Sequence, residues 1–349
     1  MTVTDAPVEP AATSVVQTPS PSTLKLSVVI PLCNEVGSLP QLHAELKAAI
    51  AEMDRYERHE LIFVDDGSTD GSDRVLRELF ERDQSIKVIQ FRRNFGKSAG
   101  LAAGFRLASG DHIVTMDSDL QDVPAEMHKL LEPIVRDEAD LVSGWKTPRL
   151  DPISKTLPSS IFNRVVRMAS GVELHDFNSG FKAYRHEVLP ELNLYGEMHR
   201  YIPVLAHFRG FRVAEVAVAH RPRVHGRSKF GVERYFRGFF DLLTVLFLGH
   251  YTRRPLHLFG WLGILTFGAG FLIDAYLAVL KLFFGQPIGD RPLLQLGVLL
   301  MIIGAVFVVF GLLGEMISYQ NRLSMRNDHG PPADYSVRDV LRHDSADDA

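Results

Sequence analysis

The chain has 349 residues and a formal net charge of −4, so it carries no broad excess of positive charge for binding nucleic acid. It contains a single cysteine, Cys33, which excludes an internal disulfide framework and a cysteine-rich zinc site. The first 23 residues are rich in Pro, Ala, Ser and Thr and lack the basic and apolar regions of a signal peptide, so we expect a disordered tail.

Strands and helices are expected to alternate through residues 24–144. Short apolar runs bounded by polar residues predict strands, and longer segments with apolar residues three and four apart predict helices. This alternation is typical of an α/β fold built from parallel βαβ units, which place functional groups at the carboxyl ends of the strands. The expected strands are 26–32, 59–64, 86–91, 112–116 and 139–144, and the expected helices are about 39–53, up to about 82, 96–108 and from about 124.

An acidic stretch follows the fourth expected strand, where residues 114–122 read VTMDSDLQD. Asp117 and Asp119 are two residues apart at a point where the chain can bend, so their carboxylates can converge on one cation. Hard oxygen ligands suit Mg²⁺ or Mn²⁺, and such an ion commonly keeps waters and substrate phosphates as its other ligands. The alternative is a solvated acidic turn that caps the helix beginning near Pro124.

A second acidic turn, Asp65-Asp66-Gly67-Ser68, follows the second expected strand. Asp and Ser are good caps for the next helix, and Gly permits a tight turn. Capping accounts for one aspartate and leaves the other carboxylate to accept a hydrogen bond from a ribose hydroxyl or a base N–H. Both acidic clusters lie at carboxyl ends of strands, which favours a binding site over two solvated turns.

Five motifs give the sequence a family resemblance. Residues 27–35 (SVVIPLCNE), 64–71 (VDDGSTDG) and 117–122 (DSDLQD) resemble the family 2 glycosyltransferases with a GT-A fold. Residues 176–182 (DFNSGFK) and 220–230 (HRPRVHGRSKF) are similar to the polyprenyl-phosphate glycosyltransferases, of the dolichol-phosphate mannosyltransferase and bactoprenol glucosyltransferase type. The resemblance covers about residues 24–320, and the motifs are specific together because they occur in the family's order.

The resemblance implies a role for each matching position. The implied ligands of Mg²⁺ or Mn²⁺ are Asp117, Asp119 and Gln121, and Asp119 is also placed among the catalytic residues. Asp176 is the implied residue for orienting the acceptor, and the alternative is a structural carboxylate that holds the turn at 178–180. The positions implied to bind the nucleotide sugar are Pro31, Cys33, Glu35, Asp65, Asp66, Asp117 and Ser118.

Cations around the phosphates are implied at Lys146, Lys182, Arg223 and Lys229, the last two also as catalytic residues. They have a physical reason, because a donor diphosphate and a lipid phosphate bring several negative charges into one cleft. We expect Arg223 and Lys229 to lie on a loop that closes over substrate, and the alternative is that they dock the domain on anionic lipid headgroups. The mannosyltransferase pattern has a further arginine near residues 159–160, which are both serine here.

Two long apolar runs, 256–284 and 293–317, each exceed the roughly 20 residues that cross a ~30 Å hydrocarbon core. Because only residues 285–292 separate them, we expect a transmembrane hairpin. Residues 231–254 mix charges with aromatic side chains and predict an amphipathic interfacial helix, with a core helix of the soluble domain as the alternative. The polar segment 321–349 predicts a mobile cytoplasmic tail.

Basic residues favour a cytoplasmic location for both ends of this hairpin. Eight Lys and Arg residues lie between Arg221 and Arg254, whereas Arg291 alone lies between the spans. The positive-inside rule then places the catalytic domain on the cytoplasmic side of an inner or plasma membrane. Asp274 lies deep in the first span, and because intramembrane acids are costly we expect it to face a partner helix or to pair with Lys281.

Together these expectations describe a GT-A nucleotide-sugar-binding domain at 24–230, an amphipathic segment at 231–254 and a two-helix anchor at 255–320. The implied reaction moves a hexosyl unit from a UDP- or GDP-hexose to polyprenyl phosphate, and in-line attack by the acceptor inverts the anomeric centre. Copies are also expected to associate through the transmembrane helices. Two alternatives are a processive polysaccharide synthase, whose Gln-x-x-Arg-Trp motif is absent here, and a non-catalytic membrane adaptor that kept the fold.

Overall fold

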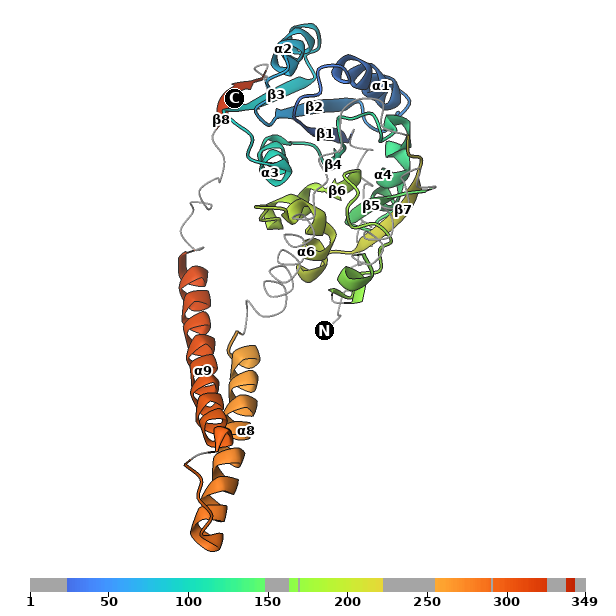
Figure 1. The fold of residues 1–349 in the computed structure, drawn as a ribbon. Helices are drawn as coiled ribbons and strands as arrows, with labels where there is room; N and C mark the ends of the chain where they lie inside the picture. The colour runs from blue at the N-terminus through green and yellow to red at the C-terminus, as the bar shows by residue number, and fades with distance from the viewer. Residues whose placement is uncertain are drawn as a thin grey trace, which may run out of the picture.

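The computed structural model describes residues 24–147, 163–168, 170–221, 255–289, 291–324 and 337–342. An α/β domain carries a long pair of helices that extends away from it (Figure 1). A mixed sheet forms the centre of the domain, with its strands in the order β7-β5-β6-β4-β1-β2-β3-β8.

The first four strands are parallel, as their alternation with helices predicts. β1 (Lys25–Leu32) pairs with β2 (Arg58–Asp65) on one side and with β4 (His112–Thr115) on the other. β2 pairs in turn with β3 (Ile86–Phe91). Because the strands are parallel, their carboxyl ends meet at one edge of the sheet, which is where open α/β sheets bind ligands.

Helices cover both faces of the sheet. Alternate residues of a strand point to opposite faces, so Val28 and Ile30 of β1 pack into one core and Val29 into the other. The first core lies under α1, α2 and α4, and the second lies under α3, η3 and α6. These helices are α1 (Leu39–Ala51), α2 (Ser72–Arg82), α3 (Lys97–Leu107), α4 (Met127–Val135) and α6 (Ile202–Phe208), with 3-10 turns at η1 (Pro124–Glu126), η2 (His186–Glu191) and η3 (Met198–Tyr201).

The sheet continues beyond β4 in a way that the sequence analysis did not anticipate. The expected fifth strand is β5 (Leu141–Lys146), but β6 (Lys182–Arg185) lies between β4 and β5 and is antiparallel to both. β7 (Val213–Val218) then pairs in parallel with β5. The interposed β6 places the segment that precedes it, residues 176–181, directly beside the carboxyl end of β4.

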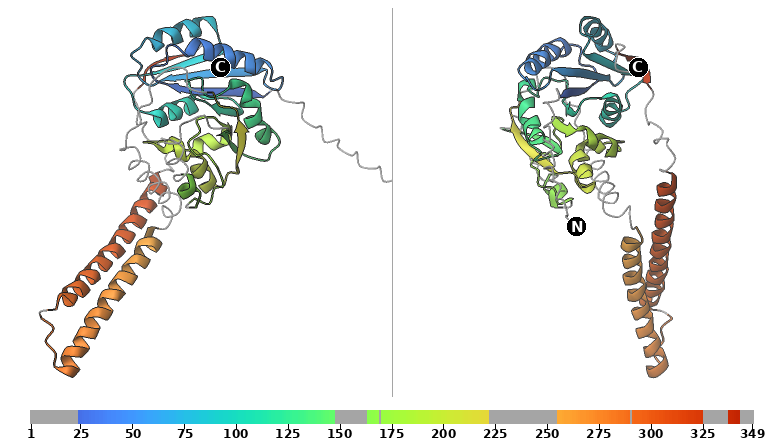
Figure 2. Two further views of the ribbon diagram at one scale, coloured as in Figure 1. Left: turned by 45° about the vertical axis from the view of Figure 1, so that its right-hand side comes forward. Right: turned by 180° about the vertical axis from the view of Figure 1, so that it is seen from behind.

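The opposite edge of the sheet is completed by the end of the chain. β8 (Val337–Leu341) lies beside β3 (Figures 1 and 2). The two strands pair antiparallel, with Val340 opposite Ile89. Arg77 Nη2 of α2 lies 3.2 Å from Asp339 Oδ2 of this strand. The prediction of a mobile tail at 321–349 is therefore wrong for residues 337–341, because the open edge of β3 offers backbone donors and acceptors that a strand can pair with.

The two apolar runs form long helices, α8 (Pro255–Phe284) and α9 (Pro292–Ser324), which lie side by side. Within them, 256–284 and 292–317 are long and apolar enough to cross a membrane. Glycines allow the two backbones to approach closely. A Cβ at Gly263 would lie 2.7 Å from the carbonyl oxygen of Gly304, and one at Gly270 would lie 2.5 Å from that of Gly297.

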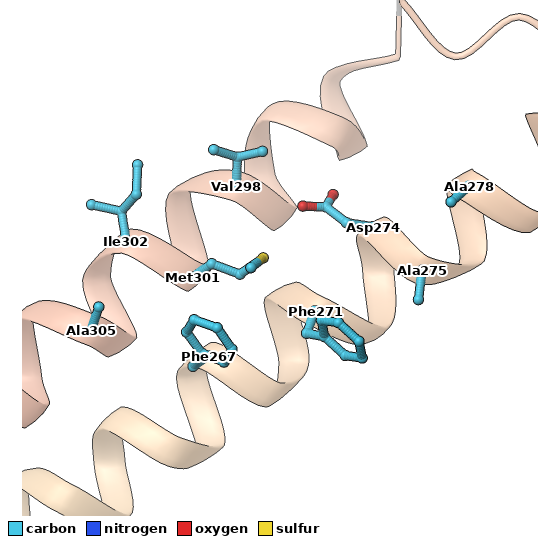
Figure 3. A pocket seen from close by; sticks show the side chains of 9 residues that line it. All are labelled: Phe267, Phe271, Asp274, Ala275, Ala278, Val298, Met301, Ile302 and Ala305. Carbon is cyan, nitrogen blue, oxygen red and sulfur yellow. The ribbon is translucent and has the colours of Figure 1, made fainter.

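Asp274 of α8 faces α9, as one of the two alternatives for this residue predicts (Figure 3). A Cβ at Gly297 would lie 2.1 Å from Asp274 Oδ1, an oxygen that is buried without a hydrogen-bond partner. The carboxylate lines a pocket of about 630 Å³ that is otherwise apolar, with Phe267, Phe271 and Met301 among its walls. The predicted amphipathic segment at 231–254 lies outside the described residues.

Candidate active site

The loops at the carboxyl ends of β1 and β2 are tied to each other. The backbone N–H of Asn34 donates to Ser68 Oγ at 2.9 Å, and Asn34 Oδ1 accepts from the backbone N–H of Thr69 at 2.8 Å. Asn34 has φ +62°, in the left-handed region that asparagine tolerates better than most residues. Glu35, predicted to bind the nucleotide, accepts a hydrogen bond from Ser38 Oγ at 3.1 Å. The two loops therefore support each other through side chains at the predicted nucleotide site.

Asp65 and Asp66 both have backbone partners. Asp65 Oδ1 accepts from the backbone N–H of Ser68 at 2.9 Å and so caps its own turn. Asp66 accepts from the backbone N–H groups of Phe95 and Gly96, at 2.6 and 2.9 Å, and so holds the loop that leads into α3. Burial raises the pKa of both carboxyls. The second aspartate thus has a structural use, and contact of either with ribose stays a prediction.

The remaining predicted nucleotide positions lie beside the acidic loop that follows β4. Ser118 Oγ of that loop lies 3.5 Å from the carbonyl oxygen of Pro31, at the end of β1. Cys33 is half-buried, and Asn94 Nδ2 donates to its Sγ at 3.4 Å. These contacts bring the segments after β4, β1 and β3 to one edge of the sheet, as the sequence predicts.

The side chains of the acidic loop have different partners. Asp117 forms an ion pair with Lys97, the first residue of α3. Asp119 Oδ1 accepts from the backbone N–H of Gln121 at 3.2 Å, and Gln121 Nε2 lies 3.4 Å from His220 Nε2. Desolvation opposes the charge of Asp117, but Lys97 and other nearby cations hold the pKa of this carboxyl well below its usual range. Asp117 is therefore an anion that already contacts a cation.

Asp176 holds a turn that packs against the acidic loop. Its Oδ1 accepts from the backbone N–H of Asn178 at 3.0 Å, and its own N–H donates to Glu215 Oε1 at 2.9 Å. The turn presses Gly180 onto Asp117, because a Cβ at Gly180 would lie 2.6 Å from both carboxylate oxygens. Asp176 was predicted either to orient the acceptor or to be a structural carboxylate. These contacts favour the second interpretation, in which Asp176 positions the turn.

The two predicted lysines in the described part differ in their surroundings. Lys146 Nζ lies 2.7 Å from Asp122 Oδ1, and although burial opposes its charge, Asp122 and Asp117 raise the pKa of this lysine above its usual range. Lys182 is fully buried and donates to the carbonyl oxygen of Ser179. Burial, with Lys97 nearby, lowers the pKa of Lys182 to about 7. Lys146 is thus a charged group beside the acidic loop, and Lys182 lies beneath it.

Arg223 and Lys229 lie outside the described residues. The chain that leads to them is anchored at the acidic loop, since the backbone N–H of Arg221 donates to the carbonyl oxygen of Gln121 at 2.9 Å. One residue earlier, His220 forms an isolated antiparallel bridge with Asp122. The described part of the motif at 220–230 therefore starts next to the predicted metal ligands.

Comparisons with known proteins identify the family. The model of glycosyl transferase family 2 matches residues 27–192. Dodecaprenyl-phosphate galacturonate synthase of Rhizobium johnstonii is 38% identical over 322 residues, which cover 91% of this chain and 93% of the relative. The chain belongs to the family 2 glycosyltransferases.

A second relative of this family 2 glycosyltransferase is the undecaprenyl-phosphate 4-deoxy-4-formamido-L-arabinose transferase of Pseudomonas aeruginosa. It is 36% identical over 294 residues, which cover 84% of each chain. The names of the two relatives both contain a polyprenyl phosphate, and they differ in the sugar.

Solved structures confirm the GT-A fold. Glucosyl-3-phosphoglycerate synthase of Mycobacterium tuberculosis, in complex with phosphoglyceric acid, has a TM-score of 0.50 and is 22% identical, covering 65% of this chain and 80% of that one. The complex of the same synthase with Mn²⁺ and UDP-glucose also has a TM-score of 0.50, at 21% identity and with 65% and 79% of the two chains covered.

The acidic loop of the glycosyltransferase has the donor chemistry for a hard divalent ion. Asp117 and Asp119 supply carboxylate oxygens two residues apart, and the ammonium of Lys97 on Asp117 shows that a cation fits against this oxygen. Among the described residues no three His, Cys, Asp or Glu side chains form a cluster that could hold a metal ion. An ion held at Asp117 and Asp119 therefore needs ligands from substrate or water, as is usual for Mg²⁺.

Sequence reasoning missed two residues that border the acidic loop. Lys97 follows the third strand at the same sheet edge as the acidic motifs, and that position is the signal that could have revealed it. His199 belongs to η3, far along the chain, and its backbone N–H donates to Ser98 Oγ at 3.0 Å. Burial, reinforced by Lys97 and Arg200, lowers the pKa of His199 well below its usual value, so the imidazole is neutral at pH 7.

Proposed function

We propose that this enzyme transfers a hexosyl unit from a nucleotide diphosphate sugar, a UDP- or GDP-hexose, to polyprenyl phosphate. The observation that carries the proposal is the acidic loop, which contacts the end of β1 through Ser118 and forms ion pairs with Lys97 and Lys146. A nucleotide base and ribose suit the loops after β1 and β2, and a diphosphate suits the two cations. The relatives at 36–38% identity carry polyprenyl phosphate in their names.

The donor binds in this proposal with its base and ribose against the predicted nucleotide positions after β1 and β2. Asp117, Asp119 and Gln121 would hold Mg²⁺ or Mn²⁺, and Gln121 Nε2 lies 3.4 Å from His220 Nε2. When bound, the ion offsets negative charge on the diphosphate leaving group. Lys146 adds a second positive charge, and its pairing with the buried carboxylate of Asp122 fixes its position.

The acceptor phosphate is already anionic at neutral pH, so it attacks the anomeric carbon without a strong general base. In-line attack opposite the leaving diphosphate inverts the anomeric centre and converts an α-linked donor to a β-linked product. The protein's contribution is to position the two substrates and to stabilise the charge of the leaving group. Asp176 contributes by holding the turn that sets Gly180 against Asp117.

The membrane arrangement is part of the proposal. α8 and α9 span an inner or plasma membrane with the catalytic domain on the cytoplasmic side, residues 231–254 lie at its surface, and copies associate through the spans. Arg223 and Lys229 bind the phosphates between the domain and the membrane. The anchoring of Arg221 at Gln121 supports this, because a trans peptide chain spans at most about 3.6 Å per residue and Arg223 follows two residues later.

The test is steady-state transfer by the purified full chain in detergent, with radiolabelled UDP- and GDP-sugars and a short citronellyl-type phosphate. We expect Lys229→Ala to lose at least tenfold in kcat, because a charge-assisted contact is worth about 1.5–3 kcal/mol. Arg136→Ala, which removes an exposed ion pair with Glu132, is the matched control and should keep wild-type kcat. Wild-type kcat for Lys229→Ala would assign Lys229 to membrane docking, and failure of every donor to transfer or hydrolyse would favour the non-catalytic adaptor.

A further inference from the structure

Lys97 stands on a fixed backbone with a side chain that reaches solvent. The two residues before it donate their backbone N–H groups to Asp66, and the residue after it, Ser98, accepts from the backbone of His199. The side chain of Lys97 is 28% exposed, and that of its partner Asp117 is 32% exposed. The ammonium can therefore move away from Asp117 while the start of α3 stays in place.

The other two lysines beside the acidic loop have no such freedom. Lys146 pairs with Asp122, whose side chain is 1% exposed, and Lys182 is buried on the carbonyl of Ser179. Of these three lysines, Lys97 is the one whose ion-pair partner is a proposed metal ligand.

We propose that Lys97 neutralises Asp117 in the donor-free enzyme and moves to the donor diphosphate when a divalent ion takes its place, so that ion and donor bind cooperatively. The inference rests on the proposed metal site. One carboxylate oxygen does not hold an ammonium and a divalent ion together, because the two cations repel at such short range. Without a diphosphate the displaced ammonium gains no anionic partner from the substrate, so the divalent ion must compete with Lys97 for Asp117.

This exchange makes two quantities depend on Lys97: the affinity of the donor-free enzyme for the divalent ion, and the increase in that affinity when a nucleotide diphosphate binds. Removing its charge frees Asp117, so the ion binds the donor-free enzyme more tightly. The same change removes the ammonium that would contact the diphosphate, so a nucleotide diphosphate increases the affinity for the ion by less. Coupling between two ligands is reciprocal, so the ion also loses its effect on the nucleotide.

The experiment measures Mn²⁺ binding by the electron paramagnetic resonance signal of the free ion, using the full chain in detergent. Each protein is titrated with Mn²⁺ alone and then with saturating UDP or GDP, against a protein-free blank with the same nucleotide. We expect Lys97→Met to bind Mn²⁺ alone at least tenfold more tightly than wild type. We expect the factor by which nucleotide increases the Mn²⁺ affinity to be at least tenfold smaller in Lys97→Met than in wild type. We expect Lys97→Arg to keep the wild-type values of both the Mn²⁺ affinity and this factor.

The matched control is Lys87→Met, because Lys87 pairs with the buried carboxylate of Glu60 at 2.8 Å, near the amino ends of the strands. It should bind Mn²⁺ as wild type does. If thermal unfolding shows that Lys97→Met is not folded, Lys97→Gln takes its place, with the same expectations for Mn²⁺ affinity and for its increase by nucleotide. Equal or weaker Mn²⁺ binding by the folded variant, or absence of nucleotide coupling in wild type, overturns the proposal.

A further variant separates this inference from the proposed metal site. If Asp119→Asn binds Mn²⁺ as wild type does, the metal site itself is wrong and the role of Lys97 falls with it. If Asp119→Asn loses Mn²⁺ while Lys97→Met leaves affinity and coupling unchanged, the metal site stands and the exchange at Lys97 is refuted.

Discussion

Replacing Gly180 by alanine tests how tightly the acidic loop is positioned. A Cβ at this residue would lie 2.6 Å from both carboxylate oxygens of Asp117, and ordinary contacts begin at 3.4 Å. The carboxylate must therefore retreat by about 0.8 Å, in the part of the site that we assign to the metal ion. Misplacement by about 1 Å costs an enzyme roughly 10²-fold in rate, so we expect Gly180→Ala to lower kcat by about tenfold to a hundredfold.

The fold should tolerate this substitution. The Asp117 side chain is 32% exposed and can rotate toward solvent, so the midpoint of thermal unfolding should change by no more than about 2 °C. The assay is steady-state transfer with labelled donor over a range of Mn²⁺ concentrations, since a displaced ligand also raises the concentration of Mn²⁺ needed for half-maximal rate. Gly289→Ala is the control, because a Cβ there meets nothing within 4 Å. Wild-type kcat and Mn²⁺ dependence in a folded Gly180→Ala protein would refute the packing argument.

Three other outcomes follow from the structure. Asp119→Asn should lower kcat by roughly 10² or more if the ion stabilises the leaving group, and full activity in EDTA would contradict this. Burial opposes the charge of Glu60, but hydrogen bonds from Lys87, Ser27 and Ser109 hold its pKa at about 2. Chemical denaturation should show Glu60→Gln about 1.5–3 kcal/mol less stable at pH 7, with the difference shrinking as pH falls from about 4.5 toward 2; a pH-independent difference would be inconsistent. Deleting residues 337–349 should destabilise the catalytic domain by about 1–4 kcal/mol through four lost cross-strand pairs, and an unchanged unfolding midpoint would show that β8 contributes nothing.

Hydrophobic periodicity was enough to predict β1 to β5 and the helices between them. The ends differ by at most about two residues, except that the helix expected from Pro124 starts as the 3-10 turn η1 and continues as α4 from Met127. These elements are regular and each buries a clear apolar face, as Val28 and Val29 do on the two sides of β1. β6 escaped prediction because its four residues begin with Lys182 and end with Arg185, and only its place between two strands stabilises it. β8 escaped because its pairing partner lies about 250 residues away in a different motif.

At the site, the acidic motifs were found because residue type and strand-end position carry the signal locally. The ion pair of Lys97 with Asp117 and the contact of Gly180 with the same carboxylate depend on how α3 and the turn before β6 pack, which no local pattern records. The second use of Asp66, as an acceptor for the start of α3, was hidden for the same reason. Lys182 matched a phosphate-binding position by motif, whereas its burial on Ser179 is a property of the assembled sheet.

The pairing of β8 with β3 constrains the path of the chain through a bilayer. β3 precedes both apolar helices and β8 follows them, yet the two strands share one sheet and so must lie on the same side of any membrane. The number of crossings between Phe91 and Val337 is therefore even. The two spans that α8 and α9 offer satisfy this parity, so a single reporter placed directly after β8 would reveal the side of the whole sheet.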